Sequence, residues 1–448
     1  MLRIYQRLYT AILLSIGLLS GVHGQSQYNL SLNESIRLAL ANNRTLKVDS
    51  ISLSVSREET QTVRSGLLPS VDFDANVNHY FQKPLFFGFE TSPVPASDKI
   101  GYGRFGGKDQ ASFSLTAAVP LYKPATKAGV EKSRLLEKQS VLQYKATASD
   151  IVAQVKQVYL RMLVLAKRLQ LQEESIERNV RALEDARSLL AQGKALRVDT
   201  LRAYTSWKNL EPDLLRLHYY IEVSRQELRV ITGLDSVEDL HLTDTLAFDE
   251  HELIPSEREI FNVALNNRPA LKLLALRQTT ARKDLEIARK EKLPAVNAIG
   301  NYQLLTQASG FKYHDAHWPS VSFVGIQTRI PLFAGHLHRS KINIAKLQER
   351  QSLLQYEEAV EKLHTQTQEI AAALNETRQR IQTQENVVST AETSYVLTKY
   401  RYERGAATRL ELTDAELALT TAQSNYLEAV FNYLSARINM NRITGSIE

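Results

Sequence analysis

The sequence of 448 residues contains no cysteine, which excludes a disulfide framework and a lipid anchor on an N-terminal cysteine. Long hydrophobic runs are missing too, because the apolar stretch AILLSIGLLSGV at 11–22 is too short for a spanning helix. A strong excess of one charge is also absent, since the chain has 55 Lys and Arg residues and 49 Asp and Glu residues, which gives a net charge of only +6. These charges are interspersed, which disfavours nucleic acid as a partner. With 43% hydrophobic residues, the chain is not disordered either.

Motifs that carry chemistry are equally scarce. No glycine-rich phosphate loop follows a predicted strand, and no nucleophile stands in a recognisable arrangement with a base. HLHRSK at 336–341 holds two histidines two residues apart, but it opens a predicted helix and no third metal ligand is near. His314 and His317 lie in a predicted loop, where the same argument applies. We therefore expect no enzyme, no cofactor and no metal site.

What is present begins with a predicted signal peptide at residues 1–24. Arg3 and Arg7 supply the basic start, the apolar run follows, and Val22 and Gly24 are small residues suited to cleavage. The alternative is an ordinary amphipathic N-terminal helix. On the first interpretation the protein is exported and the mature chain begins near residue 25.

The remaining sequence is an internal repeat. ALANNRTLK at 39–47 matches ALNNRPALK at 264–272, VPLY at 119–122 matches IPLF at 330–333, and ITG at 231–233 recurs at 443–445. The common order of these matches predicts a tandem duplication. We place the first repeat at 25–233, an irregular equatorial segment at 234–255 and the second repeat at 256–448.

Each repeat is predicted to run helix, two strands, very long helix, turn and return helix. The apolar residues of the long helix are spaced 4, 3, 4, 3, as in Ile151, Val155, Val158 and Met162, which indicates a heptad seam and left-handed supercoiling. The predicted helices cover 32–67, 125–191, 197–231, 256–292, 336–402 and 408–443, and the first-repeat strands lie near 70–81 and 110–122.

The strands are long and alternate. In QASFSLTAAVPLY at 110–122, apolar residues from Ala111 to Leu121 fall on one face, and Ser112, Ser114 and Thr116 fall on the other. Such a length suits a tilted strand that crosses a bilayer, with a soluble β-layer as the alternative. Four strands per chain cannot close, so three copies are expected to form a twelve-stranded barrel with an apolar outside and a wet lumen. Polar residues interrupt the heptad seam of the second repeat, which suits a helical wall that is wet on its inner side, with ordinary surface positions as the alternative: Thr367, Thr377, Gln384 and Glu392.

At this point the sequence resembles the outer-membrane efflux proteins, the TolC-like trimeric channel-tunnels. The resemblance rests on LSLNESIRLALANNRTLK, LLPSVDF, AVPLY, RIPLFAGHLHRSK, LRVITG and YRYERGAATRLELTDAELAL, in this order. It implies a mainly α-helical homotrimer with a β-barrel in the outer membrane and a helical barrel in the periplasm. The implied partners are a periplasmic adaptor, an inner-membrane transporter and outer-membrane lipid.

The resemblance also implies a periplasmic gate at the turns after the long helices. Tyr402 falls where the family has a constricting tyrosine, Asp199 where its carboxylate partner is expected, and Glu411 and Asp414 where acidic residues ring the lumen. A threefold ring of carboxylates concentrates negative potential and favours cations. The alternatives are that the acids favour a helix start near Thr408 and that Tyr402 packs in the seam.

Two positions depart from the family pattern. The family's gate arginine is replaced by Ala407, with Arg409 displaced by two residues, and Glu411 is one methylene longer than the expected aspartate.

The tip turns are the expected adaptor surface, around 185–205 and 396–416. The residues proposed for this contact are Gly193, Arg401, Gly405 and Leu410.

Two other classes of protein remain open at this stage. A periplasmic or secreted coiled-coil scaffold without a pore would share the helices, and it would be soluble without detergent. A periplasmic adaptor is also rich in helical hairpins, but it would not carry a duplicated plan of long strands.

Overall fold

The structure, a computed structural model, describes residues 28–83, 85–87, 102–104, 106–234, 240–249, 252–310 and 313–446. The signal peptide predicted at 1–24 lies outside these residues. The chain divides into two compact units that we treat separately. The helical unit comprises 1–50, 144–270 and 360–448, and the sheet unit comprises 51–143 and 271–359. Each unit takes segments from both sequence repeats, whose proposed boundaries stay a prediction.

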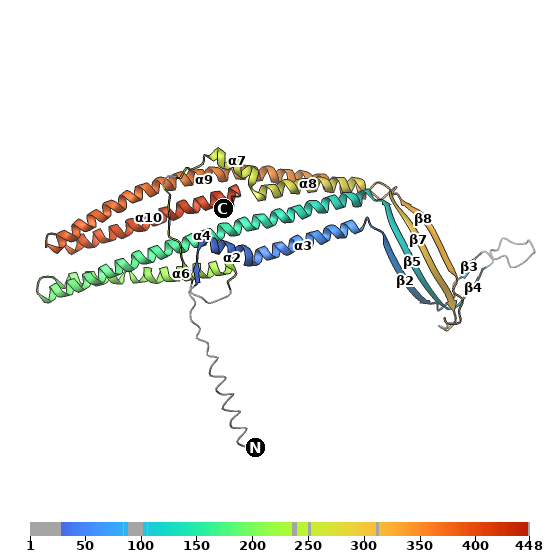
Figure 1. Cartoon of the computed structure of the whole chain (residues 1–448), viewed down its shortest axis with the longest axis horizontal. Coiled ribbons are helices and arrows are strands. Elements are labelled where there is room, and N and C mark those ends of the chain that lie inside the picture. Colours follow the sequence, from blue (N-terminus) through green and yellow to red (C-terminus); the bar gives the residue numbers. More distant parts are fainter. Residues whose placement is uncertain are drawn as a thin grey trace, which may run out of the picture. The chain divides into compact units, whose positions relative to one another are not determined.

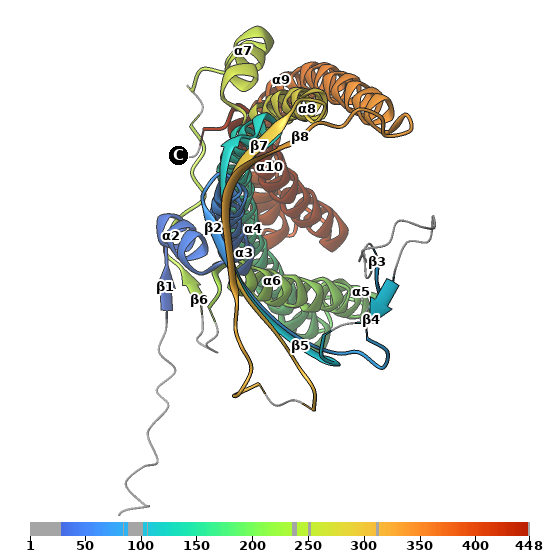
Figure 2. The same ribbon diagram turned by 90° about the vertical axis from the view of Figure 1, so that its right-hand side faces the viewer.

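The sheet unit contains one antiparallel sheet of four long strands, in the order β2-β5-β7-β8 (Figures 1 and 2). The strands have 10 or 14 residues, close to the lengths that the sequence predicted: β2 Ser70–His79, β5 Asp109–Tyr122, β7 Ala295–Ala308 and β8 Ser320–Arg329. The two repeats meet inside this sheet, because β5 of the first pairs with β7 of the second.

The pairing register sets which side chains share a face. Leu115 of β5 stands opposite Phe73 of β2 and Tyr302 of β7, so these strands share an apolar face. On the other face the Asn301 amide donates to Thr116 Oγ1 (2.9 Å). β8 departs from the predicted alternation, since its register puts Phe323 opposite Asn301, on the polar face. Register with a neighbour, rather than one strand's own pattern, decides the face.

Both outer strands of this sheet are open. Among the strands that the structure describes, none pairs with the outer edge of β2 or of β8. Every residue of β2 is exposed, and so is every residue of β8 except Gly325. The sheet of one chain is therefore incomplete at two edges.

The sequence between β2 and β5 is rich in glycine, proline and aromatic residues, which predicts a loop. That prediction needs a correction, because β3 Leu85–Phe87 and β4 Tyr102–Arg104 within this segment pair antiparallel. Three residues per strand are too few for a recognisable alternation.

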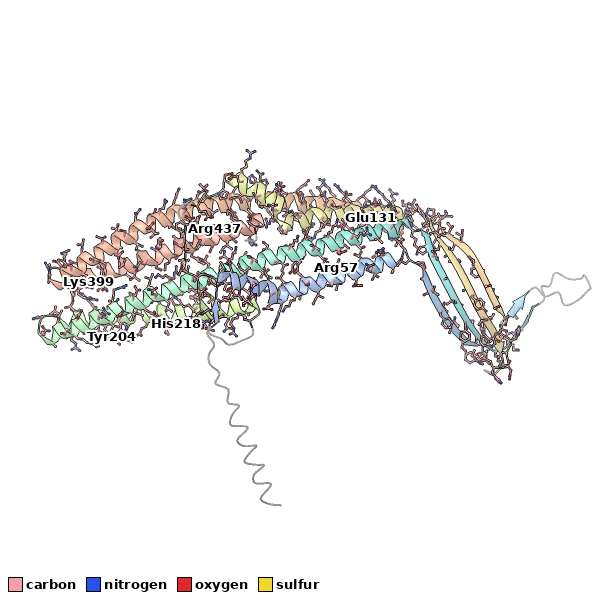
Figure 3. The ribbon with its side chains drawn as sticks, viewed as in Figure 1. Arg57, Glu131, Tyr204, His218, Lys399 and Arg437 are labelled. Atoms are coloured by element: carbon pink, nitrogen blue, oxygen red, sulfur yellow. The ribbon has the colours of Figure 1, made fainter. Side chains whose placement is uncertain are left out.

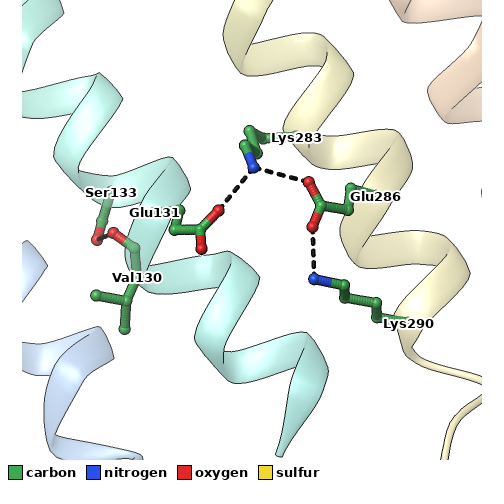
Figure 4. Close-up of polar contacts among 6 residues, drawn as sticks. All are labelled: Val130, Glu131, Ser133, Lys283, Glu286 and Lys290. Carbon is green, nitrogen blue, oxygen red and sulfur yellow. Dashed lines mark hydrogen bonds and ion pairs between the residues drawn. The ribbon is translucent and has the colours of Figure 1, made fainter.

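The helices of the sheet unit are joined by ion pairs. The Lys283 ammonium on α8 (Pro269–Lys290) donates to Glu131 Oε2 on α4 (Pro124–Ala191) at 2.6 Å and to Glu286 Oε2 at 2.8 Å, and Lys290 bonds Glu286 Oε1 (Figure 4). These hydrogen bonds, first from Lys283 and then from Lys290, lower the pKa of Glu286 to about 2. Arg57 on α3 (Arg44–Ser65) reaches Glu137 Oε1 on α4 at 3.3 Å; Arg57 and Glu131 are labelled in Figure 3.

Replacing Glu286 with glutamine should remove an acid-dependent part of the stability. A carboxyl with a lowered pKa contributes stability above its unfolded pKa of about 4.5, and that contribution is lost as the pH falls through about 2. Because Glu286 is partly exposed, we expect no more than about 1 kcal/mol. Hydrogen exchange of α8 between pH 5 and pH 2 would check this, with Glu349→Gln, which removes the Arg282 ion pair, as the control. An unchanged acid dependence in Glu286→Gln would contradict it.

The helical unit confirms the predicted heptad seam. Ile151, Val155, Val158 and Met162 of α4 are buried and pack with Leu228 and other residues of one core cluster. The helices that lie wholly or largely in this unit, besides α4, are α2 Leu32–Asn42, α5 Arg197–Lys208, α6 Glu211–Thr232, α7 Glu257–Asn267, α9 Leu337–Glu403 and α10 Arg409–Thr444. α4 and α9 have 68 and 67 residues, close to the lengths that the sequence predicted.

Three helices that were predicted as continuous are interrupted. α2 and α3 are separated at Asn43, whose side chain donates to Ile231 O (2.9 Å) and accepts from Thr45 N (2.9 Å). α7 ends before Arg268 because the following Pro269 disfavours a helical conformation there. α5 and α6 are separated at 209–210, where Gln172 donates to the carbonyl of Leu210 (2.9 Å). The breaks at Asn43 and at 209–210 are stabilised by tertiary contacts, whereas the break at Arg268 follows from the local restriction that proline imposes.

The segment at 234–255 was predicted to be irregular, and part of it is ordered by pairing. β6 Leu240–Leu242 lies parallel to β1 Tyr28–Leu30. Asp244 Oδ2 then accepts from the Tyr159 hydroxyl (2.8 Å) and from Leu32 N (2.7 Å). Glu252 forms an ion pair with Arg437 of α10, which Figure 3 labels. The segment therefore ties several helices of the unit together.

Two of the polar seam residues do not support a wet helical wall. Thr367 and Thr377 are 0% and 4% exposed within a single chain. Their hydroxyls donate to the carbonyls of His364 (2.8 Å) and Ala373 (2.6 Å) of the same helix. Threonine at a buried helical position satisfies its hydroxyl in this way without water.

No helix among the described residues is long and apolar enough to cross a membrane.

Candidate functional site

Two helix turns of the helical unit repeat the same backbone geometry. Gly193 after α4 and Gly405 after α9 have φ values of 72° and 74°, the left-handed conformation that favours glycine. Lys194 N donates to Leu189 O (2.8 Å), and Ala406 N donates to Arg401 O (2.8 Å), which are equivalent bonds. Figure 3 labels Tyr204 on α5 and Lys399 on α9, which follow and precede these turns in the sequence. Both predicted turn glycines thus end their long helices as the sequence indicated.

The acidic residues predicted at the gate include two helix caps. The Asp199 carboxylate accepts from Leu196 N (3.1 Å) at the start of α5. At the start of α10, Glu411 Oε2 accepts from Thr408 N, and Thr408 Oγ1 accepts from Glu411 N, both at 3.2 Å. This reciprocal capping box stabilises the helix start. Helix capping alone explains an acidic residue at each of these two positions. A role of these acids in a carboxylate ring at the gate stays a prediction.

The other residues of the turn are mostly at the surface. Asp414 and Arg401 are exposed, and the Arg401 guanidinium donates to Ala406 O (3.0 Å). Leu410 is 56% exposed, although it is a large apolar side chain. The turn therefore exposes acidic, cationic and apolar side chains to its surroundings.

Tyr402 is half-buried and meets Arg409. The Arg409 guanidinium carbon lies 5.8 Å from the centre of the Tyr402 ring, within the range of a cation–π contact. No hydrogen bond joins Tyr402 to Asp199 within the described part of one chain. The displaced arginine thus reaches the tyrosine, and a tyrosine–carboxylate latch stays a prediction.

Arg409 also belongs to a buried ionic cluster that sequence reasoning missed. Its side chain is 9% exposed and lies 3.9 Å from the carboxylate of Glu416, which is 7% exposed. Arg178 of α4 lies beside α10, where it donates to Thr420 Oγ1 (3.4 Å). Arg409 Nε and Nη2 and Glu416 Oε2 are buried without a hydrogen-bond partner among the described residues. Such a pair is costly to bury and costly to break.

The electrostatics of this cluster follow from its burial. Burial raises the pKa of Glu416, and the positive charges of Arg409, Arg178 and Lys399 oppose that rise. Burial also raises the pKa of Tyr395 on α9, and the charge of Glu416 adds to the effect. Protonation of Glu416 would therefore change the charge balance between α4, α9 and α10 near the turn.

A sequence signal for the cluster did exist. Arg409 and Glu416 are seven residues apart and alternate with Leu412 and Leu419 at spacings of three and four. Both leucines are buried, so the two charged residues occupy seam positions of the same helix face. Two oppositely charged residues one heptad apart on this seam could have been recognised as a buried pair.

No group of three or more His, Cys, Asp or Glu that could hold a metal occurs within the described ranges.

Comparison with known proteins identifies the family. Residues 35–234 and 260–446 match the family described as outer membrane efflux protein, so the chain belongs to that family. The chain is 21% identical to the proteases secretion protein PrtF of Dickeya chrysanthemi, over 98% of this chain and 92% of that protein. It is 21% identical to the outer membrane protein TolC of Vibrio cholerae, over 87% and 85% of the two chains.

The solved structures give the same fold. The outer membrane channel CmeC of Campylobacter jejuni superposes with a TM-score of 0.75 at 17% identity, over 92% of this chain and 85% of that chain. The fold is therefore that of the TolC-like channel-tunnels, as the sequence resemblance implied. The protein is accordingly placed in the outer membrane, with its helical body in the periplasm.

Proposed function

We propose that this chain is one subunit of a homotrimeric channel-tunnel that gives exported molecules a passive path across the periplasm and the outer membrane. It would serve a tripartite efflux system or a type I secretion system, with a periplasmic adaptor and an inner-membrane transporter as partners. No catalytic step is assigned to the chain, and transport energy would come from the inner-membrane transporter.

The observation that carries this proposal is the sheet with two open edges. Four strands of bilayer length leave the backbone groups of β2 and β8 unpaired along their outer edges. In lipid each unpaired backbone group costs several kcal/mol, so an open sheet is not a stable membrane structure. Pairing β8 of one copy with β2 of the next removes both edges, and three copies would give twelve strands.

The turns after α4 and α9 are the proposed gate and adaptor surface. Exposed apolar residues next to capped helix starts are suited to contact with another helical hairpin, and they include Leu196, Leu201, Tyr400 and Leu410. We assign Asp199, Tyr402, Glu411 and Asp414 to the gate, and Gly193, Arg401, Gly405 and Leu410 to adaptor contact.

The decisive experiment is purification from membranes followed by planar-bilayer recording. We expect the protein in the outer-membrane fraction, a mass of three chains in detergent, and discrete single-channel conductance. Recovery as a soluble monomer without conductance would instead support the scaffold alternative.

The gate assignment predicts a change in ion selectivity. The double substitution Glu411→Gln and Asp414→Asn removes six carboxylates from a trimer, and we expect the preference for cations to fall by about tenfold, with weaker block by divalent cations. Glutamine keeps an oxygen that can accept from Thr408 N, so the capping box is retained. Single-channel reversal potentials in a salt gradient would measure the effect.

The matched control for this experiment is Glu403→Gln with Glu428→Gln, which removes the same charge from exposed sites on α9 and α10. Unchanged selectivity in the gate variant, or an equal change in the control, would remove Glu411 and Asp414 from the gate.

A further inference from the structure

The net positive charge of the chain is concentrated where the strands meet the helices. Four short segments of the sheet unit together contain nine Lys and Arg residues but only two acidic residues, Glu286 and Glu291. These segments are 64–70, 121–129, 286–296 and 328–342. The whole chain, by comparison, has a net charge of +6. Both acids are already paired, Glu286 with Lys283 and Lys290, and Glu291 with Lys341 at 2.7 Å. Several cations of this region therefore have no local neutralising partner.

Part of this region forms a small cavity of about 210 Å³ in the sheet unit, which we call the basal pocket. It lies between the end of α8, the end of β8 and the start of α9, and its main lining residues are Lys292, Leu332, Phe333, His336, His338 and Arg339. Lys292 and Arg339 form no ion pair with any residue in the described ranges. The pocket thus gathers two free cations and two imidazoles around an empty space.

The apolar side of the pocket is unusually exposed. Leu332 and Phe333 are 93% and 87% exposed to solvent in one chain. Removing such side chains from water is favourable by about 1.5–3 kcal/mol each, so their exposure points to contact with an apolar phase. An apolar pair beside cationic side chains matches the boundary between acyl chains and headgroups.

Two details of the pocket indicate a built site. His336 has a φ of 64°, the one positive value among the described non-glycine residues, and it follows Gly335 at 52°. Side chains held in this conformation cost free energy and are concentrated at ligand sites. His338 Nδ1 is shielded from solvent and has no hydrogen-bond partner among the described residues. A ligand oxygen in the pocket would satisfy this nitrogen.

We propose that the basal pocket binds the phosphate headgroup of an anionic glycerophospholipid in the periplasmic leaflet of the outer membrane. Lys292 and Arg339 would neutralise the phosphate, His338 would donate to one of its oxygens, and Leu332 and Phe333 would lie against the acyl chains. This placement rests on the proposed function, because it requires the strands to cross the membrane. Charge complementarity favours an anionic lipid over a zwitterionic one.

The test is native mass spectrometry of the detergent-purified full chain with phosphatidylglycerol or phosphatidylcholine. We expect preferential retention of phosphatidylglycerol that weakens with added salt. The variant Lys292→Gln with Arg339→Gln should bind it about thirty-fold less tightly. The control Lys346→Gln with Arg350→Gln removes two exposed cations further along α9 and should bind normally.

Each contrary result has a separate meaning. Displacement of the lipid by equimolar inorganic phosphate would identify a free-anion site and overturn the lipid assignment. Equal retention of both lipids, or an equal loss in the control variant, would overturn the pocket as a binding site. Planar-bilayer recording of the same samples tests the proposed function independently: normal conductance with no lipid preference rejects only the pocket, and absent conductance in the unaltered protein rejects the channel.

Discussion

Replacing Val324 with proline should abolish assembly of the trimer and with it all channel conductance. Leu305 N donates to Pro319 O (3.1 Å), so these opposite residues form a hydrogen-bonded pair of the β7–β8 ladder. Such pairs alternate along an antiparallel ladder, and the N–H of Val324 therefore points away from β7, toward the open edge. Proline removes this donor and its ring occupies the space of an incoming strand.

The opposite edge gives an independent version of the same test. Tyr80 N donates to Lys108 O (2.7 Å), so by the same alternation the N–H of Ala75 in β2 points to the open edge. Ala75→Pro should have the effect of Val324→Pro, because each seam joins β8 of one copy to β2 of another. We would measure the mass in detergent and the conductance of both variants.

Val324→Ala is the matched control, since it shortens the same side chain and keeps the backbone donor. It should assemble as the unaltered protein does. A stable trimer in both proline variants would show that the two edges are not the seams between subunits, and the barrel proposed here would then be wrong.

Truncation of Arg409 to alanine should loosen the α9–α10 turn strongly. It leaves Glu416, 7% exposed, as a buried carboxylate without its nearest cation. Breaking a buried pair in this way costs about 3–5 kcal/mol. We expect hydrogen exchange over residues 395–420 to accelerate by at least about a hundredfold, and the channel to spend more time open.

This effect should depend on pH with a defined sign. Burial raises the pKa of Glu416, and removing Arg409, which lowers it, raises it further. A carboxyl whose pKa rises on folding stabilises the folded state when protonated, and that stabilisation is lost as the pH increases through the raised pKa. Arg409→Ala should therefore be least stable at neutral pH and recover on acidification. Adding Glu416→Gln should remove this pH dependence.

Arg401→Ala is the control for the Arg409 variant, because it removes a guanidinium from the same turn that is exposed rather than buried. Its cost should stay below about 1 kcal/mol. Equal acceleration of exchange in both variants, or exchange independent of pH in Arg409→Ala, would show that the buried cluster does not hold the turn closed.

The strongly periodic parts of the fold could be predicted from the sequence. The heptad spacing from Ile151 to Met162 and the alternation around Phe113 are repeated many times, so each residue supports the same conclusion as its neighbours. The breaks at Asn43 and at 209–210 could not be predicted, because they depend on contacts with Ile231 and Gln172 that are distant in the sequence. The parallel pairing of β1 with β6 escaped prediction for the same reason.

The candidate site divides in the same way. The turn glycines and the acids near them carry a local signal, and Gly405 and Glu411 take the conformations and caps that such residues favour. The cluster of Arg409 with Glu416 was missed, since charged residues on a long helix usually face solvent. Only the packing of α4 and α9 against α10 shows that these two are buried.

The sequence by itself determined the duplicated plan, the long helices, the bilayer-length strands and the positions of the turns, because these depend on local periodicity and on residues with restricted backbones. The tertiary structure alone decided the strand order β2-β5-β7-β8, the two open edges, the burial of the Arg409–Glu416 pair and the basal pocket. These features arise from contacts between residues that are far apart in the chain. The free energies of such contacts cannot be predicted from local sequence patterns.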